Sequence, residues 1–153
     1  MEAIMETSFS TFYRILTSTN DIYQEMQRRS HLPSSEYWVM FSVYQDKCRF
    51  SHEICLVTFM SRQTVSLAVK KLMARGWISL IPSAESRRMK EIRTTEKGLA
   101  FAEKYIFPLG KMEEKAWNKL DAEEREGLIA ASSRFQSYFK EEIDTLFKED
   151  PDS

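Results

Sequence analysis

The chain has 153 residues, of which 42% are hydrophobic, 29% charged and 12% aromatic. This composition is typical of a compact domain with its own core, and it excludes disordered, collagen-like and low-complexity chains. Only four glycines and four prolines are present, so we expect a mainly α-helical fold. Residues 1–153 are treated as a single domain, because no internal repeat or Gly/Ser-rich linker divides them.

The net charge of −1 conceals a basic segment. Residues 61–97 carry a charge of +6, whereas residues 1–60 carry −2 and residues 98–153 carry −5. A basic segment on an acidic molecule suits a nucleic-acid-binding protein, because attraction to phosphate needs local positive potential. A solvated charged surface gives the same charges, so charge alone leaves both interpretations open.

The sequence argues against a membrane protein, a metalloprotein and an enzyme. No apolar run approaches the roughly 20 residues that cross a bilayer, and the N-terminal residues lack a basic leader, so we expect a cytoplasmic protein. Cys48 and Cys55 cannot form a disulfide framework and lack the paired spacing of zinc ligands. No catalytic motif or phosphate-binding glycine loop is present, so no metal site, cofactor or enzymatic activity is expected.

Two helices are predicted in the N-terminal part of the chain. Apolar residues at near-helical spacing predict the first helix at about residues 3–29, and Pro33 blocks its continuation. Ser34 or Ser35 is the expected N-cap of the second helix, which runs to about Tyr44. The second helix is apolar on all sides, so we expect it to lie at the centre of the core.

A short helix, a turn and a longer helix are predicted next. Ser51 is the expected N-cap of the short helix. Ser61 is the expected N-cap of the longer helix, which continues to Arg75 and stops at Gly76, a residue suited to the left-handed turn after a helix.

A β-hairpin is predicted to follow this helix pair. Residues 77–81 and residues 89–93 have the composition of strands, and the stretch between them is polar and basic. A helix pair followed by a hairpin with a basic tip is the winged-helix arrangement, in which the tip contacts the DNA backbone or minor groove. We therefore predict a winged helix-turn-helix fold.

Two further helices complete the chain. Thr94 or Thr95 is the expected N-cap of a long helix that extends to about Leu120 and is kinked at Pro108. A capping box at residues 121–124 begins the last helix.

The last helix carries an apolar stripe over about six turns, which is longer than one small domain needs for its own core. We therefore predict that the last helix packs against a second copy of the chain, with packing on the first helix of its own chain as the alternative. The predicted interface residues are Leu128, Phe135, Tyr138, Phe139, Ile143 and Leu146 on this helix, with Ile4 and Phe9 on the first helix.

The helix from Ser61 to Arg75 is predicted to have an apolar face and a polar face. Successive residues turn by about 100°, which places Val65, Ala68, Val69 and Leu72 on one side. On the other side, a glutamine amide can pair with an adenine edge and a lysine can neutralise a phosphate. The predicted DNA-binding residues are Ser61, Arg62, Gln63, Thr64, Ser66 and Lys70 on this helix, with Arg87, Arg88 and Lys90 near the hairpin tip.

The run SRQTVS at residues 61–66, the helix end at residues 72–76 and the segment from Arg88 to Gly98 resemble the MarR family of bacterial transcriptional regulators. The resemblance implies a winged-helix DNA-binding lobe at about residues 35–97 and dimerisation helices at about residues 1–30 and 98–148. It also implies a homodimer that binds a pseudo-palindromic site in double-stranded DNA, more often as a repressor than as an activator.

Two positions depart from the pattern of this family. Ser86 stands where the wing usually carries an acidic residue that pairs with the arginine two positions later, so that ion pair is not expected. Phe59 stands where a glycine or another small residue is common in the turn between the two helices.

The resemblance further implies a pocket for a small aromatic ligand where the dimer helices meet the DNA-binding lobe. The candidate lining residues are Phe12, Leu16, Trp38, Phe41, Phe101 and Tyr105. The alternative function for the whole chain is a winged-helix adaptor that binds protein without sequence-specific DNA binding. Binding to random duplex DNA separates the two functions, because an adaptor has little affinity for it.

Overall fold

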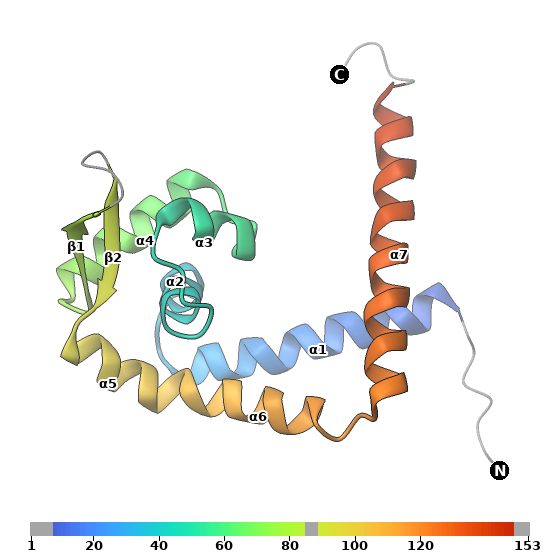
Figure 1. Cartoon of the computed structure of the whole chain (residues 1–153), viewed down its shortest axis with the longest axis horizontal. Coiled ribbons are helices and arrows are strands. Elements are labelled where there is room, and N and C mark those ends of the chain that lie inside the picture. The colour runs from blue at the N-terminus through green and yellow to red at the C-terminus, as the bar shows by residue number, and fades with distance from the viewer. Residues whose placement is uncertain (1–7, 85–88, 149–153) are drawn as a thin grey trace. The chain divides into compact units, whose positions relative to one another are not determined.

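The structure is a computed structural model, and it describes residues 8–84 and 89–148. Its helices and its hairpin follow the predicted order (Figure 1). The elements are α1 (Phe9–Arg29), α2 (Ser34–Tyr44), α3 (Ser51–Thr58), α4 (Arg62–Ala74), β1 (Ile78–Pro82), β2 (Lys90–Thr94), α5 (Glu96–Tyr105), α6 (Phe107–Trp117) and α7 (Ala122–Lys148). The predicted fold class, mainly helical with a β-hairpin wing, is confirmed.

The chain divides into two compact units, residues 1–110 and residues 111–153. The predicted DNA-binding lobe lies within the first unit. Over the two described ranges, no helix combines the length and the apolar character needed to span a membrane.

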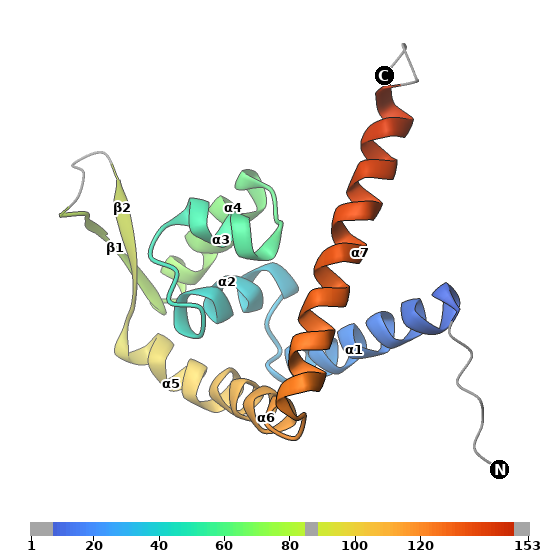
Figure 2. The same cartoon turned by 45° about the vertical axis from the view of Figure 1, so that its right-hand side comes forward.

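The helix α2 lies at the centre of the first unit, between the α3–α4 pair and α5 (Figure 2). The side chains of Tyr37, Val39 and Met40 are completely buried. The Tyr37 hydroxyl donates a hydrogen bond to the carbonyl oxygen of Tyr105 at 3.2 Å, which ties α2 to α5. The prediction of a central helix is confirmed, because a helix that is apolar on all sides is stable only when neighbours cover more than one side.

The start of α2 differs from the prediction. Pro33 occupies the N-cap position, with no hydrogen bond from its side chain, and Ser34 is already the first residue of the helix. The prediction that Ser34 or Ser35 is the N-cap is therefore wrong. The fixed φ of proline places the chain at the helix entrance without a capping hydroxyl.

The start of α3 also differs from the prediction, since Phe50 occupies the N-cap position and Ser51 lies inside the helix. The Glu53 carboxylate accepts hydrogen bonds from the backbone N–H groups of Arg49 at 2.6 Å and Phe50 at 2.9 Å. A carboxylate in the first turn thus binds backbone N–H groups at the helix entrance and suits the positive end of the helix dipole. Ser51 is not the N-cap.

The strands β1 and β2 pair in an antiparallel hairpin, with Ile78 opposite Thr94 and Leu80 opposite Ile92. Ile78 and Ile92 are buried, so the base of the hairpin is fixed on the core. The Ile92 N–H donates to the carbonyl oxygen of Arg49 at 2.7 Å, which joins the α2–α3 loop to β2. The predicted wing is therefore anchored on two sides at its base.

The junction between the wing and α5 requires a glycine. Thr95 is the N-cap of α5, and its hydroxyl accepts a hydrogen bond from the Gly98 N–H at 3.1 Å and donates one to the Gly76 carbonyl at 2.6 Å. A Cβ atom on Gly98 would lie 1.9 Å from the carbonyl oxygen of Trp77. No side chain fits at Gly98, because two backbone segments approach each other there.

The predicted long helix is interrupted before Pro108. The helix α5 ends at Tyr105, and α6 begins at Phe107 after the fully buried Ile106. Proline has no N–H for an intrahelical hydrogen bond, and its ring clashes with the carbonyl four residues earlier. The predicted single long helix with a kink at Pro108 is instead two helices, α5 and α6, which are divided at Ile106, just before this proline.

The helix α7 begins with the predicted capping box. The Asp121 N–H donates to Glu124 Oε2, and the Glu124 N–H donates to Asp121 Oδ1, both at 2.8 Å. No residue of α7 is buried, and its predicted apolar stripe is exposed, from 37% for Phe135 to 62% for Tyr138. Among the described residues of its own unit, nothing buries this apolar stripe.

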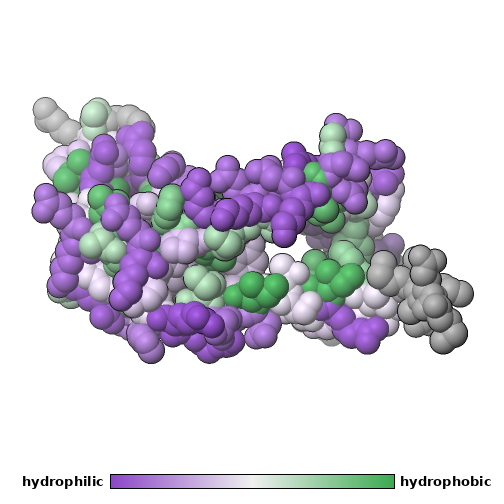
Figure 3. All heavy atoms as spheres, turned by 90° about the horizontal axis from the view of Figure 1, so that it is seen from below, coloured by the Kyte–Doolittle hydropathy of each residue, from purple (hydrophilic) through white to green (hydrophobic). Residues whose placement is uncertain are grey.

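The helix α1 also has an exposed apolar side. None of its residues is buried, and Phe9 and Ile22 are each 64% exposed. Hydrophobic side chains reach the surface between hydrophilic ones on the face shown in Figure 3. Ile4, a predicted interface residue, lies outside the described residues.

Candidate nucleic-acid interface

The N-terminus of α4 is closed by the predicted cap. Ser61 Oγ accepts a hydrogen bond from the Thr64 N–H at 3.1 Å and lies 2.8 Å from Thr64 Oγ1. Arg62 and Gln63, between these two residues, are exposed. A helix N-terminus at the surface carries a partial positive charge, so this end of α4 is suited to a phosphate group.

The two predicted faces of α4 are confirmed. Its buried residues are Val65, Ala68, Val69 and Leu72. Gln63, Ser66, Leu67 and Lys70 are exposed on the other side. The helix is held by its apolar face, and its amide, hydroxyl and ammonium groups face solvent.

A buried carboxylate of α2, Glu36, binds two cationic side chains: Lys71 in α4 and Arg75 at the C-cap of α4. The Glu36 side chain is 1% exposed, Arg75 Nε donates to its Oε2 at 3.0 Å, and Lys71 Nζ lies 3.7 Å from its Oε1. The Arg75 guanidinium also lies over the Trp77 ring, 5.5 Å from its centroid. These contacts fix the C-terminal end of α4. Sequence reasoning missed Glu36, although a single carboxylate in an apolar helix is a signal for a buried ion pair.

A second ion-pair cluster lies at the base of the wing. Arg49 Nε donates to Glu91 Oε1 at 2.8 Å, and Arg93 Nη2 lies 2.6 Å from the same oxygen. The hydrogen bond from Arg49 lowers the pKa of the Glu91 carboxyl below its ordinary value, against the opposing effect of burial. The cluster connects the α2–α3 loop with β2 and was not predicted from the sequence. Ser86 and Arg88, between which no ion pair is expected, lie outside the described residues.

Every predicted DNA-binding residue that the structure describes has an exposed side chain. These residues are Ser61, Arg62, Gln63, Thr64, Ser66, Lys70 and Lys90. Arg87 and Arg88 lie outside the described residues. The helix α4 packs directly against β1, the first strand of the wing (Figure 1). The helix and the wing therefore belong to the same lobe.

The turn between α3 and α4 has an unusual backbone. Phe59 has φ 57° and ψ 15°, in the left-handed region, and its side chain is 88% exposed. This region favours glycine, which explains why a glycine or another small residue is common at this position in the family. Phe59 therefore combines a strained backbone with an apolar side chain in solvent.

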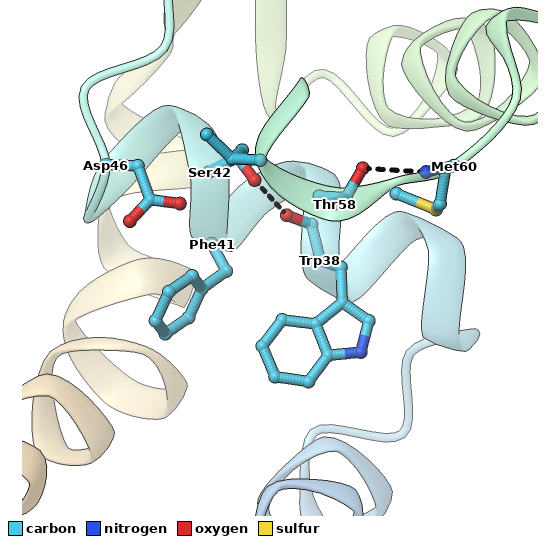
Figure 4. Close-up of a pocket in the computed structure, with 7 residues that line it drawn as sticks. Trp38, Phe41, Ser42, Asp46, Thr58 and Met60 are labelled. Atoms are coloured by element: carbon cyan, nitrogen blue, oxygen red, sulfur yellow. Dashed lines mark hydrogen bonds between the residues drawn. The ribbon is translucent and has the colours of Figure 1, made fainter. Parts of the chain in front are cut away.

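A cavity of about 280 Å³ lies between α2 and the end of α3 (Figure 4). It is lined by Trp38, Phe41, Ser42, Asp46, Val57, Thr58 and Met60. The cavity thus extends from the central helix to the turn that precedes α4.

The six predicted ligand-pocket residues are not gathered at this cavity. Trp38 and Phe41 line it. Phe101 is instead buried. The centroid of its ring lies 4.3 Å from the centroid of the Trp77 ring and 5.1 Å from that of the Tyr105 ring. The other two, Phe12 and Leu16, lie on α1, where Phe12 is half-buried and Leu16 is exposed.

The cysteines lie in or beside the core. Cys48 is buried, and burial raises the pKa of its thiol above the ordinary value. Cys55 is half-buried and packs against the core. Over residues 8–84 and 89–148, no group of three His, Cys, Asp or Glu side chains is placed to hold a metal ion.

Parts of the chain are similar in sequence to a known family and to a known regulator. Residues 32–89 match the model of the MarR family. Over 108 residues, the chain is 26% identical to the uncharacterized HTH-type transcriptional regulator YybA of Bacillus subtilis (strain 168). The aligned segment covers 67% of this chain and 69% of YybA.

Two solved structures are similar in fold to the chain. The MarR family regulator NMB1585 of Neisseria meningitidis has a TM-score of 0.73 and 17% identity, covering 89% of this chain and 96% of its own. MepR of S. aureus, solved as a complex with DNA, has a TM-score of 0.67 and 19% identity, covering 88% of this chain and 98% of its own. The resemblance to the MarR family predicted from the sequence is confirmed.

Proposed function

From its MarR family segment at residues 32–89 and its winged-helix fold, we propose that this chain is a DNA-binding transcriptional regulator and acts in the cytoplasm. The observation that carries the proposal is the exposed polar face of α4 beside the wing. A helix fixed by its apolar side and open on its polar side is suited to enter a major groove.

Each exposed residue has a role that follows from its chemistry. Amide and hydroxyl groups bind base edges, whereas guanidinium and ammonium groups bind phosphate. In the proposed complex, Gln63, Thr64 and Ser66 contact bases, Arg62 and Lys70 contact phosphates, and Arg87, Arg88 and Lys90 anchor the wing.

The regulator acts as a homodimer in this proposal. The support is the apolar stripe of α7 and the apolar side of α1, each of which is exposed in the single chain. Two copies place their α4 helices in successive major grooves of a pseudo-palindromic site, with half-site centres about 10 base pairs apart. Binding of such a site represses transcription by occupying it.

A small aromatic ligand relieves the repression. The aromatic side chains of Trp38 and Phe41 at the cavity support this part of the proposal. A ligand acts only through a difference in its affinity for DNA-competent and DNA-incompetent conformations.

Binding of the purified chain to random duplex DNA at increasing salt concentration tests the function. We expect the logarithm of affinity to fall linearly with the logarithm of salt concentration, because bound cations release counterions from the phosphates. Selection of bound duplexes from a random library then identifies the preferred site. A chain with no salt-dependent affinity for duplex DNA would instead be a protein-binding adaptor.

A further inference from the structure

The exposed face of α4 has an apolar residue at its centre. Leu67 is 54% exposed, and it lies in the middle of this helix. With about 100° between successive residues, Gln63 lies about 40° from Leu67 around the helix, whereas the buried Val65 lies about 160° away. Leu67 therefore points away from the core of its lobe, among the polar side chains that are proposed to contact DNA.

Both ends of α4 are fixed, so the fold sets the direction of Leu67. At the N-terminus, Ser61 Oγ accepts a hydrogen bond from the Thr64 N–H at 3.1 Å. At the other end, Arg75 Nε donates to the buried Glu36 carboxylate at 3.0 Å. The backbone at Leu67 thus needs no rearrangement before binding, which lowers the entropic cost of a contact at this residue.

Thr64 adds a second apolar group beside Leu67. The two residues are three positions apart, so their side chains are neighbours on the helix surface. The Thr64 hydroxyl oxygen lies 2.8 Å from Ser61 Oγ and is engaged in the helix cap. The γ-methyl group of Thr64 is therefore left for contact with a base, and it extends the apolar surface of Leu67.

Thymine is the base that suits such an apolar contact. Its C5-methyl group lies in the major groove, where the edges of adenine, guanine and cytosine present hydrogen-bonding groups instead. A leucine against the cytosine amino group would leave that donor without an acceptor, which is unfavourable. Leu67 therefore favours thymine and disfavours cytosine at the position that it contacts.

The spacing of Leu67 and Gln63 fits neighbouring A·T pairs. The two residues are one helical turn apart, with Cβ atoms about 5–6 Å from each other. Successive bases of a strand are about 3.4 Å apart. When Gln63 pairs with an adenine edge, Leu67 thus reaches a base within about two pairs of that adenine.

We propose that Leu67 determines sequence specificity by contacting the 5-methyl group of a thymine in the major groove, with the Thr64 methyl group beside it. This inference rests on the proposed function, because it requires α4 to enter a major groove. It adds one base to the preferred half-site: a thymine within about two base pairs of the adenine that Gln63 contacts.

Replacement of thymine by deoxyuridine tests this contact, because uracil keeps the O4 acceptor and lacks only the methyl group. The preferred duplex, selected from a random library, is made with each thymine replaced in turn. Its affinity for the full chain is measured by fluorescence anisotropy. We expect about fourfold weaker binding for one thymine position of each half-site, as burial of a single methyl group predicts.

Variants at Leu67 assign this difference to its side chain. Leu67→Ala should bind the thymine and uracil duplexes with affinities that differ by less than about twofold, because the methyl group has lost its partner. Leu67→Met keeps a long apolar side chain and should retain the difference of about fourfold. The matched control Leu99→Ala, at an exposed leucine of α5, should also retain it.

Three results would overturn the contact: a preferred site without thymine near the adenine, unchanged affinity after replacement of every thymine, or an equal loss for Leu67→Ala on both duplexes. The last result would assign Leu67 to the sugar–phosphate backbone. Circular dichroism checks the fold of each variant. A chain that selects a duplex and gives one of these results keeps the proposed function and loses the thymine contact, whereas a chain that binds no duplex loses both.

Discussion

Glu36 of α2 and Arg75 at the end of α4 are joined by a hydrogen bond of 3.0 Å, although they are 39 residues apart in the sequence. The carboxylate is buried, whereas the guanidinium is partly exposed. The bond therefore fixes the end of the proposed recognition helix on the central helix of the core.

Removal of Arg75 is expected to destabilise the fold. The variant Arg75→Met leaves the buried Glu36 carboxylate with Lys71 at 3.7 Å as its remaining ion-pair partner, so the free energy of unfolding should fall by about 1–3 kcal/mol. Urea unfolding at neutral pH measures this change. The control Lys97→Met, at an exposed position of α5, should change the free energy by less than about 0.5 kcal/mol. Equal effects of the two variants would contradict the role of the buried pair.

The stabilising effect of Glu91 should depend on pH. Hydrogen bonding from Arg49 lowers the pKa of Glu91 from its ordinary value of 4.5, so the folded protein binds this proton less readily than the unfolded chain. The contribution is therefore complete at neutral pH and is lost as the pH falls below about 4.5 toward the folded pKa. Thermal unfolding of the chain and of the Glu91→Gln variant between pH 7 and pH 3 measures the difference.

Arg49→Gln is the matched control for this pH dependence. It removes the donor that causes the shift, so replacing Glu91 in that background should have a smaller effect at neutral pH. A stability difference between the unsubstituted chain and its Glu91→Gln variant that stays constant down to pH 3 would show that the ion pair does not stabilise the wing.

Two glycines should respond in opposite ways to alanine. Gly98→Ala places a Cβ atom 1.9 Å from the Trp77 carbonyl oxygen, so the backbone must move and the fold should lose about 1–3 kcal/mol or more. Gly127→Ala lies in α7 with no atom within 4 Å of the new Cβ, and it should gain about 0.5–1 kcal/mol of helix stability. Urea midpoints of the two variants decide this, and a neutral Gly98→Ala would rule out the close approach.

Base contacts and phosphate contacts should be distinguishable on α4. Gln63→Ala should lower affinity for the preferred duplex by about 1–3 kcal/mol and relax the choice of sequence. Lys70→Ala should weaken binding to all duplexes and reduce the salt slope by about one. Fluorescence anisotropy with preferred and random duplexes at several salt concentrations measures both effects. The reverse pattern would exchange the two assigned roles.

Local features of the fold were predictable because they depend on residues close in sequence. The faces of α4 follow from the helical repeat, and its limits follow from the hydroxyl of Ser61 and the left-handed Gly76. The two N-cap predictions that were wrong concern the starts of α2 and α3. At both places, another residue close in sequence can also begin the helix. Glu53 binds two backbone N–H groups at the start of α3, and Pro33 stands immediately before α2.

The sequence by itself determined the order of helices and strands, the polar face of α4 and the resemblance to a family of regulators, because each depends on spacing along the chain. Only the tertiary structure decided that Glu36 pairs with Arg75 and Glu91 with Arg49, which lie 39 and 42 residues away, and that Asp46 and Thr58 line one cavity. Burial of a carboxylate is favourable only with its partner in place, and that partner is set by how whole elements pack.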